Sequence, residues 1–474
     1  MNDDGEQLTT DYGRLAETFS NMCETIIPAK PRSISQAWTT RRLFHLALII
    51  PAFLLFSITW QETAGLAILI LFFGVLLMPD VSADFAGGGE VAIGPPSRAG
   101  AFLYPLAILA LALIFRQNLA VVAAAWALLA LGDGMAGVVG ESWGKHALPF
   151  NYAKTWEGFA AFIVFGGAGA FLLILWVSST RPNLKALIVC LAAAVVGAFV
   201  ESLPIRLNDN ITVPLICGGF IFCAGLIKRA SLDHNLPYLG IRVGLAIIIN
   251  LAFALLAWKL RQITASGAAA GFLLGVAVYL GFGYKSFLIL FCFFVLGIGS
   301  TRMGYARKRE RGIAERRSGA RSWPEAAANV LAAAFFAVLA ITTPYQWTFL
   351  MAFIAAIAEA AGDTVASEIG KWLSPRAYLI TTFRPVAAGE NGGISLAGTA
   401  AGLGASGVVV LLSYGLGLCG GWNAGVVLGA ACIGNLADSL IGATLERRGL
   451  VTNSIVNFMG ATLAGGLALA FALR

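Results

Sequence analysis

The sequence predicts an all-α protein: a polytopic bundle of transmembrane helices with about 15 spans and two related halves. Three observations predict this fold: the composition, the succession of long apolar runs, and a motif that occurs twice. Of the 474 residues, 58% are hydrophobic and only 12% are charged, and the mean hydropathy is +0.80. A soluble domain carries about a quarter charged residues. The solvent that suits this chain is therefore lipid, where helices satisfy their own backbone hydrogen bonds.

Apolar runs close to the ~20 residues needed to cross a bilayer follow one another along the chain. We predict spans near 43–59, 63–78, 100–115, 119–140, 157–177, 184–201, 211–227, 239–257, 266–281, 285–300, 324–342, 346–362, 396–416, 423–444 and 454–472. Many of these runs are rich in Ala and Gly, and the chain has 55 Gly residues in all. Small residues let membrane helices approach closely, so close packing is the role expected of most glycines.

The distribution of Lys and Arg predicts the orientation in the membrane. When the loops are assigned alternately to two sides with the N-terminus inside, most of the 32 Lys and Arg residues fall inside, as the positive-inside rule requires. The clearest exception is Lys228-Arg229. We therefore expect a cytoplasmic N-terminus and a C-terminus on the far side. The net charge of +7 indicates membrane orientation and contact with anionic lipids, and no nucleic-acid partner is expected.

Acidic residues near the span ends are candidate functional residues, because ionisable groups are costly in a membrane. The candidates that we select all face the cytoplasm in the topology derived from the basic residues. They lie in four regions: LGDG at 131–134 followed by ESWGKHALPFNYAKTWEG at 141–158, Glu201 followed by IRLNDNITVP at 205–214, EAAGDTVASEIGKW at 359–372, and GNLADSLIGA at 434–443.

One motif occurs in both halves of the chain. The pattern GDxxAxxxG at 132–140 recurs at 362–370, and an acid before Ser-Leu occurs later in each half, as Glu201 and as Asp438. The spacing between the two copies is similar in both cases. We interpret this as a diverged duplication with one active site in each half.

Acids beside lysines at a water-facing helix end indicate Mg²⁺ and phosphate. Carboxylates bind the hard cation through oxygen, lysines act as point charges on phosphate oxygens, and glycines let backbone N–H groups approach phosphates. In the first half the candidate acids are Asp133, Glu157, Glu201 and Asp209, with Lys145 and Lys154 as phosphate-binding residues. In the second half they are Asp363, Glu368 and Asp438, with Lys371 and Arg384 as basic partners and Gly389, Gly392 and Gly393 around Asn391 as a phosphate-facing turn.

The predicted metal ligands are Asp133, Glu201, Asp363 and Asp438. One carboxylate, such as Asp133, could instead act as the general base toward an acceptor, and the sequence leaves both roles open. The basic run at 302–321 is interpreted as an ordinary cytoplasmic loop. The chain contains no GxxxxGK[ST] loop, kinase HRD set or GxSxG elbow, so phosphoryl chemistry would require a different, membrane-embedded site.

The first half resembles a known family. GDGMAGVVGESWGKH, KTWEG and ESLPIRLNDNITVPL, together with RRLFHLALIIP at 41–51 and GAFLYP at 100–105, are similar to the dolichol kinase and phytol kinase family of CTP-dependent polyprenol kinases. The resemblance covers about residues 40–230. It implies CTP as the phosphoryl donor, and it adds Gly132, Thr155 and Asn210 to the residues expected at the nucleotide.

The second half, about 262–474, resembles a different family that includes plant phytyl-phosphate kinase. The matching stretches are STRMGYARKRERG, AAANV, GDTVASEIG, LITTFRPVAAGENGGISLAG and ADSLIGATLERRGLVTNSIVNF. Asn453 and Asn457 of the last stretch join the residues expected at the nucleotide. Where that family has Thr or Ser before Asn-Gly-Gly, this chain has Glu390, which puts the substrate or nucleotide contacts of that residue in doubt.

The two resemblances imply a fusion of sequential kinases: a cytoplasmic segment at 1–38, a first membrane domain at 39–235 and a second at 236–474. The first would phosphorylate an isoprenoid alcohol such as phytol or geranylgeraniol with CTP and Mg²⁺. The second would convert the monophosphate to the diphosphate, with a donor that could differ. The expected location is a bacterial inner membrane with the sites facing the cytoplasm. A CDP-lipid synthase and a duplicated secondary transporter are the alternatives.

Overall fold

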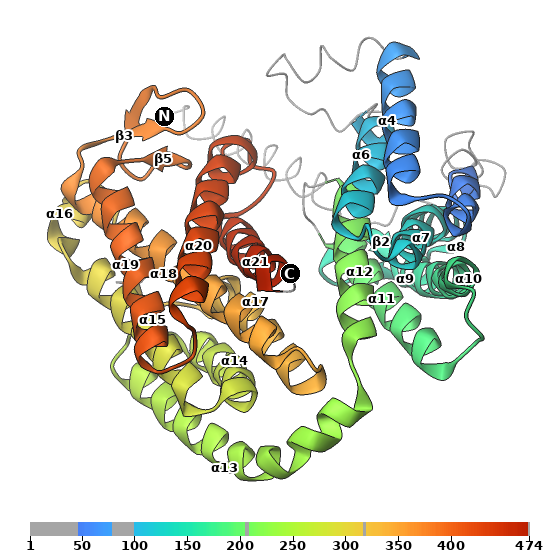
Figure 1. Ribbon diagram of the computed structural model, residues 1–474. Helices are drawn as coiled ribbons and strands as arrows, with labels where there is room; N and C mark the ends of the chain where they lie inside the picture. The colour runs from blue at the N-terminus through green and yellow to red at the C-terminus, as the bar shows by residue number, and fades with distance from the viewer. Residues whose placement is uncertain (1–45, 78–98, 204–207, 316–318, 473–474) are drawn as a thin grey trace, which may run out of the picture. The chain divides into compact units, whose positions relative to one another are not determined.

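The computed structural model describes residues 46–77, 99–203, 208–315 and 319–472. The expected cytoplasmic segment at 1–38 lies outside the described residues, as do residues 41–45 of the leading motif and Arg206. The chain divides into two compact units, Met1–Gly225 and Leu226–Arg474, and each is described by itself (Figure 1). The expected domain boundary, between residues 235 and 236, lies within helix α13 (Arg229–Lys259).

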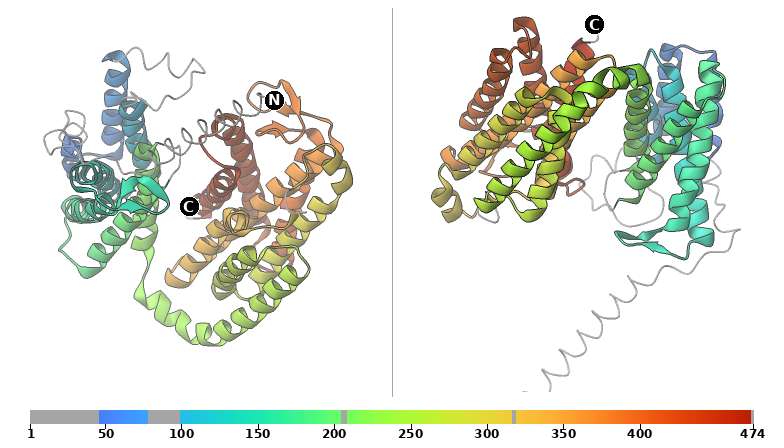
Figure 2. Two further views of the ribbon diagram at one scale, coloured as in Figure 1. Left: turned by 180° about the vertical axis from the view of Figure 1, so that it is seen from behind. Right: turned by 90° about the horizontal axis from the view of Figure 1, so that it is seen from below.

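The first unit is built from helices and one small hairpin. Its elements are η1 (Ile50–Phe56), α4 (Trp60–Leu77), α6 (Ala99–Ile114), α7 (Leu119–Ala127), η2 (Leu128–Asp133), α8 (Gly134–Trp143), β1 (Ala147–Leu148), β2 (Asn151–Thr155), α9 (Trp156–Ala161), η3 (Phe162–Gly166), α10 (Gly167–Ser178), α11 (Leu184–Ser202) and α12 (Asp209–Leu226). The segments η2 and η3 are π-helical turns inside the long helices 119–143 and 156–178. Seen from below, the hairpin β1–β2 projects from one end of these helices (Figure 2).

The second unit is likewise built mainly from helices, with one small sheet. Its elements are α13, α14 (Ala265–Phe282), α15 (Tyr284–Arg302), α16 (Tyr305–Glu310), α17 (Trp323–Thr342), α18 (Gln346–Leu373), β3 (Arg376–Leu379), β4 (Pro385–Ala387), β5 (Gly393–Ile394), α19 (Leu396–Gly415), α20 (Gly421–Ile441), η5 (Gly442–Glu446) and α21 (Asn453–Ala472). The three short strands form an antiparallel sheet in the order β4-β3-β5.

The predicted all-α membrane architecture is confirmed. Among the described residues, 12 helices are long and apolar enough to cross a membrane, and two shorter apolar helices, Trp60–Phe72 and Phe102–Ile114, accompany them. These 14 helices correspond to all but the first of the predicted spans. Helix α18 continues to Leu373, beyond the predicted end at 362, so its acidic motif is helical throughout.

The first predicted span, 43–59, is wrong for its described part, which forms only the short 3₁₀-helix η1. Pro51 stands at the start of this turn, and proline has no N–H to donate. Thr59 then opens the next helix, because its backbone N–H donates to Glu62 Oε2 at 2.7 Å and its hydroxyl accepts from the Glu62 N–H at 3.3 Å. This reciprocal capping is a strong helix start, so the described residues before it do not continue into α4 as one helix.

Glycines bring the acid-bearing helix of each unit against the next helix. A Cβ on Gly158 would lie 2.9 Å from the Ala136 carbonyl oxygen, and a Cβ on Gly398 would lie 2.7 Å from the Ala366 carbonyl oxygen. Real Cβ atoms do not approach backbone oxygens this closely, so the helix pairs α8–α9 and α18–α19 depend on Gly at these crossings.

The same crossing is capped in the same way in both units. The Thr155 hydroxyl accepts from the backbone N–H of the third following residue at 3.2 Å, and the Ser395 hydroxyl does so at 3.1 Å. A Cβ on Gly140 would lie 3.2 Å from the Thr155 hydroxyl, and one on Gly370 would lie 3.1 Å from that of Ser395. Both units therefore join the helix of the Gly-Asp motif to a hydroxyl-capped helix through a short strand segment, with the same glycine contacts.

Candidate active site

In the first unit, Lys154 and Glu201 form an ion pair between the hairpin and the end of α11. The Glu201 side chain is only 5% exposed. Its second oxygen, Oε2, accepts from the Ser202 hydroxyl at 3.3 Å. The hairpin is held at this place by Asn151, whose side-chain amide donates to the Ser202 carbonyl at 3.0 Å. Strand β2 thus fixes Lys154 over the buried carboxylate at the helix end.

Two further predicted acids act on the same lysine. Burial lowers the pKa of the Lys154 ammonium, but the neighbouring carboxylates, Glu201 first among them, raise it above its ordinary value. Asp133 and then Asp209 are the other carboxylates that act on it. Asp133 ends the π-helical turn η2, and Asp209 begins α12. The structure therefore places Glu201 in contact with Lys154, and the charges of Asp133 and Asp209 also act on this lysine.

The remaining predicted residues of this unit have different surroundings. Glu157 Oε1 lies 2.7 Å from His146 Nδ1, in a pair whose histidine is largely exposed. Lys145 is exposed, and Asn210 is buried beside Asp209. Thr155 caps α9 and Gly132 packs against a phenylalanine ring, since a Cβ there would lie 2.9 Å from Phe162.

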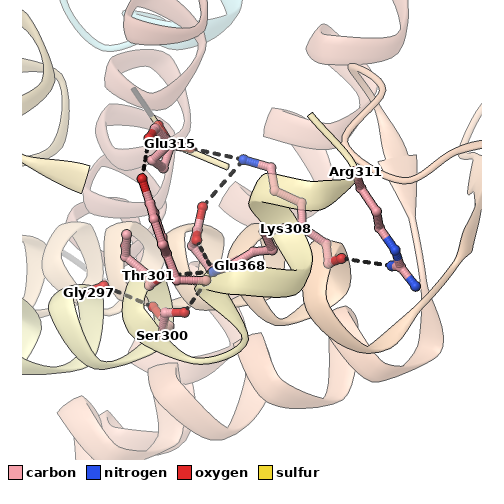
Figure 3. A network of polar contacts seen from close by, with 9 residues as sticks. Gly297, Ser300, Thr301, Lys308, Arg311, Glu315 and Glu368 are labelled. Carbon is pink, nitrogen blue, oxygen red and sulfur yellow. Dashed lines mark hydrogen bonds and ion pairs between the residues drawn. The ribbon is translucent and has the colours of Figure 1, made fainter. Parts of the chain in front are cut away.

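The second unit contains a buried chain of charges at the end of α18 (Figure 3). Lys308 is 0% exposed, and its ammonium donates to Ser300 O at 3.1 Å, to Thr301 O at 2.8 Å and to Glu368 Oε2 at 2.5 Å. An ammonium has three donors, and all three are used. Lys308 therefore ties the end of α15 to α18.

The same chain continues to Lys371. Its ammonium lies 3.3 Å from Glu368 Oε1 and 2.9 Å from Glu315 Oε1, so both oxygens of Glu368 face lysines. Burial raises the pKa of Glu315, but the Lys371 ammonium outweighs it and holds the pKa of that carboxyl below its usual range. Arg311 donates to the Lys371 carbonyl at 3.4 Å (Figure 3).

Three carboxylates lie deeper in the helices of this unit. Asp363 and Asp438 are within hydrogen-bonding reach of each other. Glu359, one turn earlier on α18, is close enough to be influenced by both charges. Asp438 is 9% exposed and its Oδ2 has no hydrogen-bond partner among the described residues. The predicted acids Asp363 and Asp438 are thus brought together from α18 and α20.

The glycine turn before α19 packs on the end of α20. Gly392 has a φ of +72°, which suits glycine, and a Cβ there would overlap the backbone of Ala443. Asn391 and Arg384 are exposed. Glu390 Oε1 lies 3.8 Å from Arg447 Nε, so the residue that departs from the family pattern pairs with a cation of the neighbouring turn.

The two asparagines of α21 are placed differently. Asn453 is exposed at the helix start. Asn457 is buried, and its amide donates to Asn329 Oδ1 at 3.3 Å. Asn457 therefore faces the inside of the bundle, beside α17.

The described residues contain no group of three or more His, Cys, Asp or Glu side chains arranged to hold a metal ion. Magnesium, however, is usually bound through one or two carboxylates, with waters and substrate phosphates completing its shell. The neighbouring carboxylates Asp363 and Asp438, with Oδ2 of Asp438 unpartnered, fit that requirement. In the first unit both oxygens of Glu201 are engaged, by Lys154 and by Ser202.

The sequence analysis gave no role to Lys308 and Glu315, and it included Glu359 in an acidic region without a role of its own. Lys308 and Glu315 belong to the basic run interpreted as a solvated loop, and that interpretation is wrong for Lys308, which is fully buried. The available signal was that Lys308 lies within STRMGYARKRERG, a stretch that matched a family pattern. For Glu359 the signal was an acid four residues before Asp363, and hence on the same face of one helix.

Comparison with known proteins gives the chain relatives among membrane proteins. The model of the family described as integral membrane protein DUF92 matches residues 248–465. An uncharacterized membrane protein of Synechocystis sp. is 35% identical over 234 residues, which is 47% of this chain and 90% of that protein. The chloroplastic protein VTE6 of Arabidopsis thaliana is 34% identical over 214 residues, covering 44% of this chain and 64% of that protein.

A further relative carries an enzyme name. The chloroplastic phytol kinase 1 of Arabidopsis thaliana is 33% identical over 122 residues, which is 24% of this chain and 40% of that protein. No solved structure matches the chain.

Proposed function

The chain belongs to the DUF92 family of integral membrane proteins, and on this premise we propose that it is a membrane kinase of isoprenoid lipids with one phosphoryl-transfer site in each unit. The first unit would phosphorylate an isoprenoid alcohol of the phytol or geranylgeraniol type with CTP. The second would phosphorylate the resulting monophosphate. The similarity to a protein named phytol kinase supports the alcohol as the acceptor class.

The observation that carries the proposal is the ion pair of Lys154 with the buried Glu201 carboxylate at one end of the first unit, where the charges of Asp133 and Asp209 also act on the lysine. Phosphoryl transfer depends mostly on positioning and on charge stabilisation. Lys154, held in place by the buried Glu201 carboxylate, would supply the fixed positive charge that phosphoryl transfer requires beside a phosphate. Because both oxygens of Glu201 are engaged, we assign Glu201 to holding Lys154 and Asp133 to the metal or to the acceptor proton.

The proposed step in the first unit joins the alcohol oxygen to the terminal phosphorus of CTP. The bond from that phosphorus to the bridging oxygen breaks, CDP leaves with the electron pair, and the alcohol proton passes to a carboxylate or to water. Mg²⁺ would supply charge neutralisation on the transferred phosphate. Lys154 would hold a phosphate oxygen, and Asp209 would be the second acid near it.

In the second unit we propose that Asp363 and Asp438 take the metal and that Lys371 takes a phosphate. Glu368, predicted as catalytic, has both oxygens on lysines, so we assign it to positioning Lys371. Arg384, Asn391 and Asn453 are exposed at the same end as candidate nucleotide contacts. The sites would face the cytoplasm of a bacterial inner membrane, since the basic loops lie at these helix ends.

A CDP-lipid synthase would use CTP at a similar cluster of acids and lysines, but the named relatives favour phosphoryl transfer. A transporter would place its site near the bilayer midplane, whereas Lys154 and Lys371 lie at helix ends.

Product analysis tests the proposal. Purified full-length protein is incubated with Mg²⁺, CTP labelled on its terminal phosphate, and a set of isoprenoid alcohols. The expected products are CDP and a labelled isoprenyl phosphate. Release of labelled pyrophosphate with formation of a CDP-lipid would overturn the kinase in favour of cytidylyl transfer.

A further inference from the structure

Glu359 is a buried carboxylate that the proposed reaction does not use. It is 1% exposed, and its Oε1 has no hydrogen-bond partner among the described residues. A buried carboxylate without a partner is costly. Among the described residues, Glu359 takes part in no ion pair. The buried carboxylates Glu201 and Glu368, by contrast, each pair with a lysine.

Two glycines of neighbouring helices make room for this side chain. A Cβ on Gly460 of α21 would lie 2.5 Å from Glu359 Oε1 and 3.4 Å from Asp438 Cβ, and a Cβ on Gly434 of α20 would lie 2.8 Å from Glu359 Cγ. Glu359 Oε1 and Asp438 Cβ therefore both lie beside Gly460, where α18, α20 and α21 meet.

Three buried side-chain oxygens on α18, α20 and α21 have no hydrogen-bond partner among the described residues. Besides Glu359 Oε1 they are Asp438 Oδ2 and Asn457 Oδ1, from side chains that are 9% and 8% exposed. Asn457 lies one turn before Gly460 on α21, and its amide nitrogen is occupied by Asn329. A buried group of oxygen acceptors without donors is the environment that a hard cation requires.

In the first unit an apolar residue stands at the position that corresponds to Glu359. Aligning the two GDxxAxxxG patterns, at 132–140 and 362–370, places Leu129 at the position of Glu359. Leu129 is fully buried and apolar. The extra carboxylate thus distinguishes the second site from the first, although both helices make the same glycine crossing.

We propose that Glu359 and Asp438, with Asn457 as a further oxygen donor, form a second divalent-cation site that is present only in the second unit. Asp438 lies between the two cation positions, because it contacts Asp363 and borders Glu359. The catalytic meaning of this site rests on the proposed function. An acceptor that already carries a phosphate brings more negative charge to the donor than an alcohol does, and a second cation offsets that repulsion.

Cation binding is measured with Mn²⁺ alone, by electron paramagnetic resonance of purified full-length protein in detergent. Glu359→Leu installs the residue of the first unit and is expected to bind one equivalent fewer than the wild type. Glu359→Gln keeps the shape of the side chain and is expected to weaken binding of that equivalent at least tenfold. Glu310→Gln, at an exposed glutamate of α16, is the matched control and should bind like the wild type.

Equal Mn²⁺ stoichiometry and affinity in the wild type, Glu359→Leu and Glu359→Gln would overturn the second site, whatever the enzymatic activity. The proposed function is tested separately. If Glu359→Leu removes one bound Mn²⁺ but the wild type transfers no phosphate to any isoprenoid, the second cation site stands and the kinase proposal is wrong.

Discussion

Single charged residues hold the ends of these helices together, and Lys308 is the clearest case. Its ammonium is fully buried and saturated by two carbonyls and Glu368. Buried charges are tolerated only when they are paired and hydrogen-bonded. This lysine therefore fixes both the end of α15 and the carboxylate that positions Lys371.

Replacing Lys308 by Met should destabilise the second unit by roughly 3–5 kcal/mol, because Glu368 would keep a buried charge facing the vacated space. Arg309→Met, at an exposed neighbour, should leave stability close to that of the wild type. Thermal unfolding in detergent measures both. The double variant Lys308→Met/Glu368→Met should recover part of the loss, and equal unfolding temperatures for Lys308→Met and Arg309→Met would contradict this role.

The pair of Glu315 and Lys371 predicts a pH dependence. Since the pKa of Glu315 is lowered in the folded protein, the unfolded chain binds that proton more readily, and stability rises with pH through this window. The contribution is present above the ordinary carboxyl value of 4.5 and is lost as the pH falls through the lowered value.

Unfolding temperatures of the wild type and Glu315→Gln, measured from neutral pH down to pH about 3, test it. The wild type should lose more stability on acidification than the variant, because only the wild type must protonate Glu315. Parallel curves would show that Glu315 does not contribute to the acid sensitivity.

At the scale of elements, the glycine crossings decide how the helices around each site pack. Gly398 stands where α19 crosses α18, whereas Gly404 on the same helix has no atom within 4 Å of its added Cβ. The two glycines lie on the same helix but differ in the free space around them, so Gly404 is a matched control for Gly398.

Gly398→Ala should cost about 1–3 kcal/mol, because its Cβ would lie 2.7 Å from the Ala366 carbonyl oxygen and the helices would have to separate. Gly404→Ala should be neutral or stabilising by up to about 1 kcal/mol. Thermal unfolding again compares them. If both variants unfold like the wild type, the crossing is not tightly packed.

The elements were largely predictable and their interruptions were not. Apolar length alone located the helices, because a span in lipid must be long and apolar. It failed at 43–59, whose described part forms a 3₁₀ turn with Pro51 at its start and not a spanning helix. It also could not show that the long helix 119–143 contains the π-helical turn at Asp133.

The site was predictable only in part. Asp133, Glu201, Asp363 and Asp438 stood out because acids are rare in apolar spans. Lys308 did not stand out, because a buried lysine in a basic run looks like its solvated neighbours until its three acceptors are placed around it. Glu359 lay in a predicted acidic region but received no role, because its exceptional feature, an unpartnered oxygen beside Gly460, depends on another helix.

For the whole molecule, the central claim is that each unit carries its own phosphoryl-transfer site. The chain divides into two compact units. In each unit the helix that carries the Gly-Asp motif crosses the next helix at a glycine, and a hydroxyl side chain caps the start of that next helix. Their charges differ: Lys154 comes from the hairpin of the first unit, whereas Lys371 comes from α18 itself in the second. We expect two activities that can be removed one at a time.

The most direct measurement compares Asp133→Asn and Asp363→Asn in purified full-length protein, with isoprenoid alcohols and isoprenyl monophosphates as separate acceptors. Asn keeps the shape of each side chain and removes its charge. Asp133→Asn is predicted to abolish phosphorylation of the alcohol and to spare that of the monophosphate, and Asp363→Asn is predicted to do the reverse. Loss of both activities in either variant, with unfolding temperatures unchanged, would contradict two independent sites and show that the units share one.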